Sequence, residues 1–219
     1  SGYGFYLIES EPKDASFHLV NANKRAVKSG FSGLNTNEVT IEFRIRTTAA
    51  SATQGILSYA VSGSAREILI QGSNQLTITF DSGWVVPTGI PLNDGAWRHI
   101  AICYTCFPSG SSYVPSVENV VIYLNGSAVF GAGNIRSTAN TVITSGGTLV
   151  LGDTQTSVGG GFSASTAFLG ELDDVAIWDR KLTEQEIIES ALYGPADSSS
   201  LVARYLFPNN GYDTSGNNN

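Results

Sequence analysis

The stretch Val39-Thr40-Ile41-Glu42-Phe43-Arg44-Ile45-Arg46 decides the fold. Apolar and polar residues alternate strictly along it, so every second side chain, from Val39 to Ile45, lies on one face of an extended chain. This period of two predicts a β-strand that is buried on one side only.

Further short runs rich in β-branched and aromatic residues follow this strand, separated by clusters of Gly, Ser, Asn, Asp and Pro. They lie at residues 55–60, 66–71, 75–80, 97–104, 119–124, 148–151, 172–178 and 201–207. Many short strands with such punctuation predict an all-β protein, a two-sheet antiparallel sandwich, rather than alternating βα units. Trp97 and Trp178 are expected to be large core anchors of that sandwich.

One hairpin turn is specific. Asn125-Gly126 separates the apolar runs 120–124 and 128–130, and a two-residue type I′ turn needs positive φ at both of its central positions. The same residues form, with Ser127, the sequon for N-glycosylation, so Asn125 is also a candidate glycosylation site.

A single helix is well marked. Thr183 and Glu186 have the spacing of a capping box, and Gly194 supplies a stop signal. These signals predict one short amphipathic helix near the C-terminus, over residues 182–192, that lies on the sandwich.

Length and charge exclude several classes of protein. The chain has 219 residues, which fits one domain, and its net charge is −7 with the whole acidic excess in residues 111–219. Nucleic-acid binding is not expected, because it needs clustered Lys and Arg. Membrane insertion is not expected either, because no apolar run approaches the ~20 residues of a membrane span.

The domain is expected to cover residues 1–208, because residues 209–219 have lost nearly all apolar content. Those last residues are expected to be a polar tail or a linker to a following module. The chain opens Ser1-Gly2-Tyr3 without Met, so we expect it to be a piece of a longer, processed precursor.

Several segments, in their order along the chain, resemble the pentraxin and laminin-G-like group of concanavalin A-like jelly rolls. The residues that carry the resemblance are 55–60, 67–70, 93–101, 123–126, 147–152, 159–162 and 168–179, followed by the helix and the strand at 201–207. The resemblance covers roughly residues 3–207. It implies a jelly-roll sandwich and a role in binding.

The resemblance also implies two calcium ions held by acidic and amide side chains of two loops. In the first loop, Ala65 and Arg66 stand where the family has an Asp-Asn pair. In the second loop Gln155 is kept, and the other ligand positions hold hydroxyl groups, at Thr154, Thr156, Ser163 and Thr166. One neutral amide is too few oxygen ligands for a calcium ion, so the double calcium site is predicted to be absent.

Three residues are candidate ligand contacts. Trp84, between Gly83 and Val85, is expected in a loop or an edge strand, where an indole can stack on a sugar ring. Asp153 and Gln155 belong to the second loop and provide polar groups for a ligand.

Cys103-Tyr104-Thr105-Cys106 leaves two alternatives open: a short disulfide between Cys103 and Cys106, or two unpaired thiols. Zinc and redox chemistry are disfavoured, because the chain has only two His and the first Cys ends a strand. The resemblance implies a different cystine, in which Glu42 occupies the position of the partner of Cys103.

Glu171-Leu172-Asp173-Asp174 is the most enzyme-like stretch, since laminarinase-type glucanases carry three carboxylates on one such strand. The position of the last carboxylate falls on Val175 or Ala176, so no catalytic residue is assigned. A single structural calcium ion is a candidate instead, held by Asp173 and Asp174 with Glu9.

The preferred interpretation is a non-enzymatic, secreted or cell-surface recognition or adhesion module that binds a glycan or an extracellular protein. The alternative is a structural subunit that self-associates into an oligomer, filament, sheath or appendage. A glycoside hydrolase ranks third because of the missing carboxylate.

Overall fold

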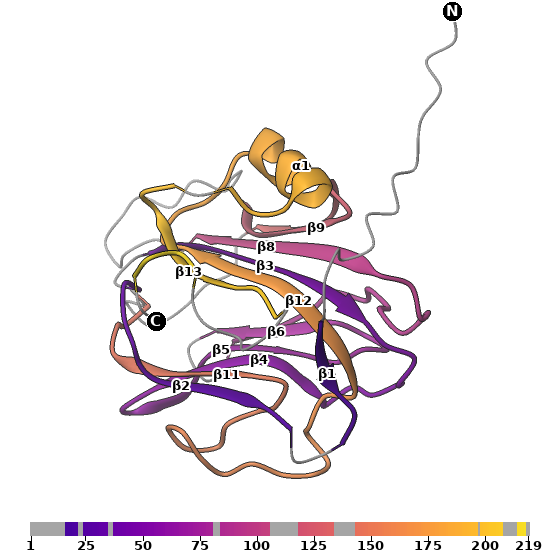
Figure 1. Cartoon of the computed structure of the whole chain (residues 1–219), viewed down its shortest axis with the longest axis vertical. Helices are drawn as coiled ribbons and strands as arrows, with labels where there is room; N and C mark the ends of the chain where they lie inside the picture. The colour runs from indigo at the N-terminus through magenta and orange to yellow at the C-terminus, as the bar shows by residue number, and fades with distance from the viewer. Residues whose placement is uncertain are drawn as a thin grey trace, which may run out of the picture.

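The computed structural model describes residues 16–21, 24–34, 37–80, 84–105, 118–133, 143–196, 198–207 and 214–217. Two antiparallel sheets lie face to face, and one helix covers the outer side of one of them (Figure 1). The all-β sandwich with a single C-terminal helix is therefore confirmed. No helix of the described part is long and apolar enough to cross a membrane.

The sheet beneath the helix, called the helix-covered sheet, has the strand order β1-β12-β3-β8-β9-β10, with β13 also beside β12. Its strands are β1 (Phe17–Leu19), β3 (Glu38–Arg46), β8 (Arg98–Thr105), β9 (Glu118–Leu124), β10 (Ser127–Gly133), β12 (Gly170–Trp178) and β13 (Leu201–Tyr205). β1 and β13 follow one another along the same edge of β12, because β1 pairs with its first residues and β13 with its last.

The second sheet, called the loop-covered sheet, has the order β2-β11-β4-β5-β6-β7. Its strands are β2 (Ala26–Phe31), β4 (Gly55–Val61), β5 (Ser64–Gln71), β6 (Thr77–Phe80), β7 (Trp84–Pro87) and β11 (Gly147–Leu151). The segment 152–169, between β11 and β12, supplies the side chains that bond to β4 and β11 below.

The predicted face of β3 forms part of the core between the sheets. Val39, Ile41, Phe43 and Ile45 are all buried in the main apolar cluster. The expectation that this strand is buried on one side only is wrong, because Thr40, Glu42 and Arg44 are buried as well. The helix and its neighbours cover their side of the sheet, a tertiary contact that the strand's own sequence does not encode.

Helix α1 (Glu184–Tyr193) lies over β8 and β9 (Figure 1). Ile187 and Leu182 pack with Trp178 in a second apolar cluster on the outer side of the helix-covered sheet. Trp178 is therefore a buried anchor as predicted, but it lies between the sheet and the helix and not between the two sheets. Trp97 is not a core anchor, because it is only partly buried. The centre of its ring lies 5.0 Å from the guanidinium carbon of Arg46.

The predicted capping box of the helix and the predicted hairpin turn are both confirmed. The hydroxyl of Thr183 accepts a hydrogen bond from the backbone N–H of Glu186, and the Glu186 carboxylate accepts one from the backbone N–H of Thr183. Asn125 and Gly126 have φ of 49° and 81°, as a type I′ turn requires. Gly126 packs against Ile188 and Ala191 of the helix, so this turn also supports α1.

The sequence missed the short edge strands β1 and β2, and it predicted only the start of β10. The described residues 214–217 lie against β13, where Asn217 Nδ2 donates to the carbonyl of Leu201 at 2.6 Å. The division between a domain and a tail at residue 208 stays a prediction.

Candidate functional site

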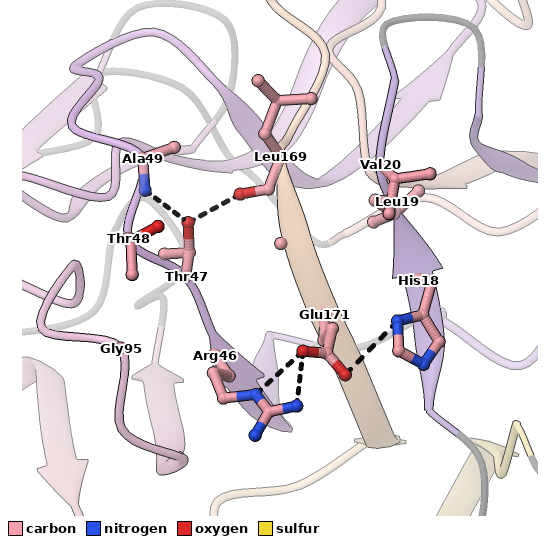
Figure 2. Close-up of a pocket in the computed structure, with 11 residues that line it drawn as sticks. His18, Leu19, Val20, Arg46, Thr47, Thr48, Ala49, Gly95, Leu169 and Glu171 are labelled. Carbon is pink, nitrogen blue, oxygen red and sulfur yellow. Dashed lines mark hydrogen bonds and ion pairs between the residues drawn. The ribbon is translucent and has the colours of Figure 1, made fainter.

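A pocket of about 570 Å³ lies at one end of the helix-covered sheet and is called the edge pocket. Four segments form its walls (Figure 2). They are residues 18–20 at the end of β1 and just after it, residues 46–49 at the end of β3 and just after it, Gly95, and residues 169–171 just before β12 and at its start. These segments meet because β12 pairs with both β1 and β3.

Glu171 lies at the centre of this pocket and is held from both sides (Figure 2). Its Oε1 accepts hydrogen bonds from Arg46 Nε at 2.8 Å and Nη2 at 2.6 Å. Its Oε2 accepts a hydrogen bond from Ser16 Oγ at 2.8 Å and lies 3.4 Å from Nδ1 of His18. Burial opposes ionisation of this carboxyl, but the contacts with Ser16, Arg46 and His18 together hold its pKa below the ordinary value, so Glu171 is an anion.

Ser16, His18 and Glu171 are the residue types of a nucleophilic triad. In such a triad the histidine lies between the nucleophile and the acid and takes the hydroxyl proton. Here the Ser16 hydroxyl donates a hydrogen bond directly to Glu171 Oε2, while His18 Nε2 lies 3.4 Å from Ser16 Oγ and His18 Nδ1 lies 3.4 Å from Glu171 Oε2. The three side chains therefore tie β1 to β12.

Asp173 and Asp174 lie where β1 and β13 meet along β12. The pairing of β12 with β3 shifts between Asp173 and Ala176, and Asp174 has a positive φ of 46°. Asp174 Oδ2 accepts a hydrogen bond from Arg44 Nε at 3.1 Å. Burial and the neighbouring Asp174 carboxylate raise the pKa of Asp173 to about 6, although backbone N–H groups of Asp174 and Phe207 oppose the shift.

This environment does not favour a calcium ion. Arg44 already neutralises Asp174, and Asp173 resists ionisation. Glu9, the third expected ligand, lies outside the described residues, and the described part of the chain contains no group of three His, Cys, Asp or Glu side chains that could hold a metal ion. The three-residue calcium site stays a prediction.

Asp153 lies near the start of the segment 152–169, which covers the loop-covered sheet, and it is fully buried. Its Oδ2 lies 3.0 Å from Arg25 Nε, and its Oδ1 accepts hydrogen bonds from the backbone N–H of Thr154 and the hydroxyl of Thr166, each at 2.8 Å. The Arg25 guanidinium also lies over the ring of Phe162, 4.2 Å from its centre. Arg25, just before β2, thus contacts this loop at Asp153 and at Phe162.

Gln155 is also fully buried, and all of its polar groups are used. Its Nε2 donates to the carbonyl groups of Ser58 and Thr148, both at 3.0 Å, and its Oε1 accepts from the backbone N–H of Gly159 at 2.7 Å. A ligand role for Asp153 or Gln155 stays a prediction, and it would require this loop to open.

The donor set of the loop does not fit the two calcium ions that the resemblance implies. Thr166 is bonded to Asp153, Thr156 Oγ1 donates to the carbonyl of Gly161, and Ser163 bonds to Ser165. The positive charge beside Asp153 is the guanidinium of Arg25. No step that depends on calcium is therefore assigned to this loop.

Cys103 lies buried in β8, and its pKa is raised chiefly by burial. The residue opposite it on β3 is Thr40, whose hydroxyl lies 3.5 Å from the sulfur. Cys103 and Glu42 therefore do not face each other as the resemblance implies for a cystine, because Glu42 pairs with Ala101. Cys103 is a free cysteine in the described part of the chain. Because Cys106 lies outside the described residues, the choice between a Cys103–Cys106 disulfide and two unpaired thiols stays open.

The remaining predicted site residues are separated in space. Trp84 is the first residue of β7 and pairs with Phe80 at the edge of the loop-covered sheet; its side chain is outside what the structure describes. Asn125 lies in the hairpin turn beside α1, and its Oδ1 accepts a hydrogen bond from the backbone N–H of His99 at 2.9 Å. Sequence reasoning missed the edge pocket, since His18, Arg46 and Glu171 come from three distant segments.

Residues 21–188 match the family described as the concanavalin A-like lectin/glucanases superfamily. Among curated proteins, human neuronal pentraxin-1 is 35% identical over 148 residues, which cover 65% of this chain and 31% of that protein. Human pentraxin-4 is 32% identical over 151 residues, which cover 66% of this chain and 29% of that protein. The chain thus spans about a third of the length of these relatives.

Solved structures share the fold at low sequence identity. The heptameric SAP-like pentraxin from Limulus polyphemus superposes with a TM-score of 0.64 at 20% identity, covering 83% of each chain. A putative carbohydrate binding protein from Bacteroides ovatus gives a TM-score of 0.60 at 18% identity, covering 90% of this chain and 55% of that one. Both matches support the jelly-roll architecture.

Proposed function

Because the chain belongs to the concanavalin A-like lectin/glucanases superfamily, we propose that it is a recognition module that binds a glycan without catalysing a reaction on it. The observation that carries this proposal is the state of the carboxylates on β12. Glu171 is bound by Arg46 and Ser16, and Asp173 is buried at the junction of β1 and β13.

Hydrolysis of the laminarinase type would need a general acid at the last carboxylate position of this strand, residue 175 or 176. Val175 packs in the core between the sheets, and Ala176 belongs to the apolar cluster beneath α1. The strand therefore offers a scaffold without a free acid and nucleophile pair, which supports binding over glucanase chemistry.

The proposal includes independence from calcium. The loop over residues 153–166 uses its oxygen atoms for internal hydrogen bonds, and Arg25 supplies the positive charge next to Asp153. A glycan is proposed to bind elsewhere on the domain by direct hydrogen bonds. We also propose a secreted or cell-surface location. The direct test adds protease to intact cells: digestion of the chain supports this location, and protection of the chain contradicts it.

The experiment is a glycan array probed with the purified chain in buffer with excess calcium and again with a chelator, together with sedimentation velocity. Binding of a defined glycan set in both buffers is expected. Ordered polymers without glycan binding would replace the proposal by the structural-subunit alternative. Release of reducing sugar that is lost in Glu171→Gln would overturn the non-enzymatic assignment.

A further inference from the structure

The edge pocket combines exposed apolar walls with charged side chains at its centre. Val20 is 67% exposed and Leu169 is 39% exposed, although both are apolar residues. Gly95 and Gly170 contribute backbone without side chains and leave the pocket open between these walls. A ligand with an apolar ring face and polar substituents matches such a surface.

The carboxylate of Glu171 and two backbone carbonyls of this pocket are already engaged in hydrogen bonds. Both carboxylate oxygens of Glu171 have their partners in Arg46, Ser16 and His18, and only 16% of that side chain is exposed. The carbonyl of Leu169 accepts from the Thr47 hydroxyl at 2.6 Å, and the carbonyl of Thr47 accepts from the backbone N–H of Gly95 at 3.0 Å.

The pocket has a hydrogen-bond donor group that its own acceptors do not use. Arg46 uses Nε and one N–H of Nη2 for Glu171, so among the described residues its Nη1 group remains unused. The Arg46 side chain is 37% exposed and that of His18 is 56% exposed. The ring of Trp97 lies over the guanidinium and holds its plane in place. The surface presented to a ligand therefore donates hydrogen bonds and needs an acceptor.

We propose that the edge pocket binds the carboxylate of an acidic saccharide, with Arg46 as the principal contact. A carboxylate has only acceptors, and its two oxygens match the parallel N–H groups of a guanidinium. A neutral sugar hydroxyl can also accept a hydrogen bond from Arg46, but it lacks the negative charge and the second oxygen that strengthen the pairing of a carboxylate with a guanidinium. This inference rests on the proposed function, glycan recognition, and assigns its site and ligand class.

The test compares matched glycans by calorimetry at pH 7.5 in chelator. One arm uses an oligosaccharide ending in a hexuronate, a second uses one ending in a sialate, and each is paired with the same glycan after reduction of the carboxyl group to an alcohol. At least one acid form is expected to bind about tenfold or more tightly than its neutral form, as charge-assisted pairing with Arg46 requires. The arm that binds identifies the source of the carboxylate.

Variants assign this preference to the pocket. Arg46→Gln is expected to abolish the preference for the acid form, whereas Arg98→Gln removes the same charge from the neighbouring strand, outside the pocket, and is expected to leave it intact. Arg46→Gln also deprives Glu171 of two hydrogen bonds, so Val20→Trp provides a second test by filling the pocket. Val129→Trp, at another exposed valine, on β10, is its control.

The outcomes separate the two proposals. Equal binding of acid and neutral forms, or equal losses in Arg46→Gln and Arg98→Gln, would overturn the pocket inference while glycan recognition stands. Glycan binding that survives Val20→Trp unchanged would also overturn it. If no glycan binds the parent chain in either buffer, the proposed function itself fails.

Discussion

The guanidinium of Arg25 lies 3.0 Å from the fully buried carboxylate of Asp153, although 128 positions separate the two residues in sequence. This pair, with the hydroxyl of Thr166 and the ring of Phe162, closes the loop over one sheet. It places a permanent cation from the chain itself beside the loop in which related proteins are expected to hold calcium ions.

Removing this cation is expected to destabilise the protein. Arg25→Gln leaves a buried carboxylate without its ionic partner, a change that costs on the order of 3 kcal/mol in comparable sites. Chemical denaturation measures the change in the free energy of unfolding. Arg66→Gln removes an exposed arginine near the start of β5 and should cost less than about 0.5 kcal/mol. Equal effects of the two substitutions would show that Arg25 has no special role.

Calcium is expected to leave the melting temperature unchanged. A ligand that binds only the native state adds about 2.7 kcal/mol when present at 100 times its Kd, which raises Tm by several degrees. Differential scanning calorimetry in excess calcium and after chelation should therefore give superimposable transitions. A rise in the Tm of the parent chain with calcium would contradict this prediction.

Asp173 is expected to make the protein less stable as pH rises. Its pKa is about 6 in the folded state and near 3.8 when unfolded, so between these values the native state binds more protons. The free energy of unfolding therefore falls as pH increases from about 4 to about 6, by at most about 3 kcal/mol. Asp173→Asn should be more stable than the parent at pH 7.5 and similar to it at pH 3.5. A variant that is less stable at pH 7.5 would contradict this assignment.

The capping box of α1 should respond to pH in the opposite sense. The hydrogen bond from Arg180, with the backbone N–H of Thr183, lowers the pKa of Glu186 to about 2. Its stabilisation is complete above the ordinary value of about 4.5 and is lost as pH falls toward 2. Glu186→Gln should cost about 1 kcal/mol at pH 7, since the pair is partly exposed. Glu184→Gln, in the same helical turn, is the control, and an equal loss in both would discount the cap.

Thr40 is expected to anchor the approach to the helix. Its buried hydroxyl donates to the carbonyl of Arg180 at 2.8 Å and accepts from the backbone N–H of Leu182 at 3.0 Å. Thr40→Val keeps the shape but leaves both backbone groups unpaired, which should cost about 1–3 kcal/mol. Hydrogen exchange at Leu182 should accelerate. Unchanged protection of that amide would refute the anchoring role.

The sequence predicted what local chemistry determines. The alternation from Val39 to Ile45 identified the core face of β3, and the positions of Asn125 and Thr183 identified a turn and a helix start. Each of these signals depends on neighbours within a few residues, so no tertiary information was needed.

What the sequence did not predict depends on contacts between distant segments. β1 has three residues, too few for a period to appear, yet it supplies His18 to the edge pocket. The register of β3 against β8 places Thr40, not Glu42, opposite Cys103. Trp97 has the composition of a core residue, but its position before β8 puts it on Arg46 instead.

Calorimetric titration of the chain with the glycan that it binds most tightly on the array, in excess calcium and again after chelation, tests glycan recognition without calcium most directly. The closed loop at Asp153 predicts the same stoichiometry and the same Kd in both buffers. Binding that appears only when calcium is present would contradict it.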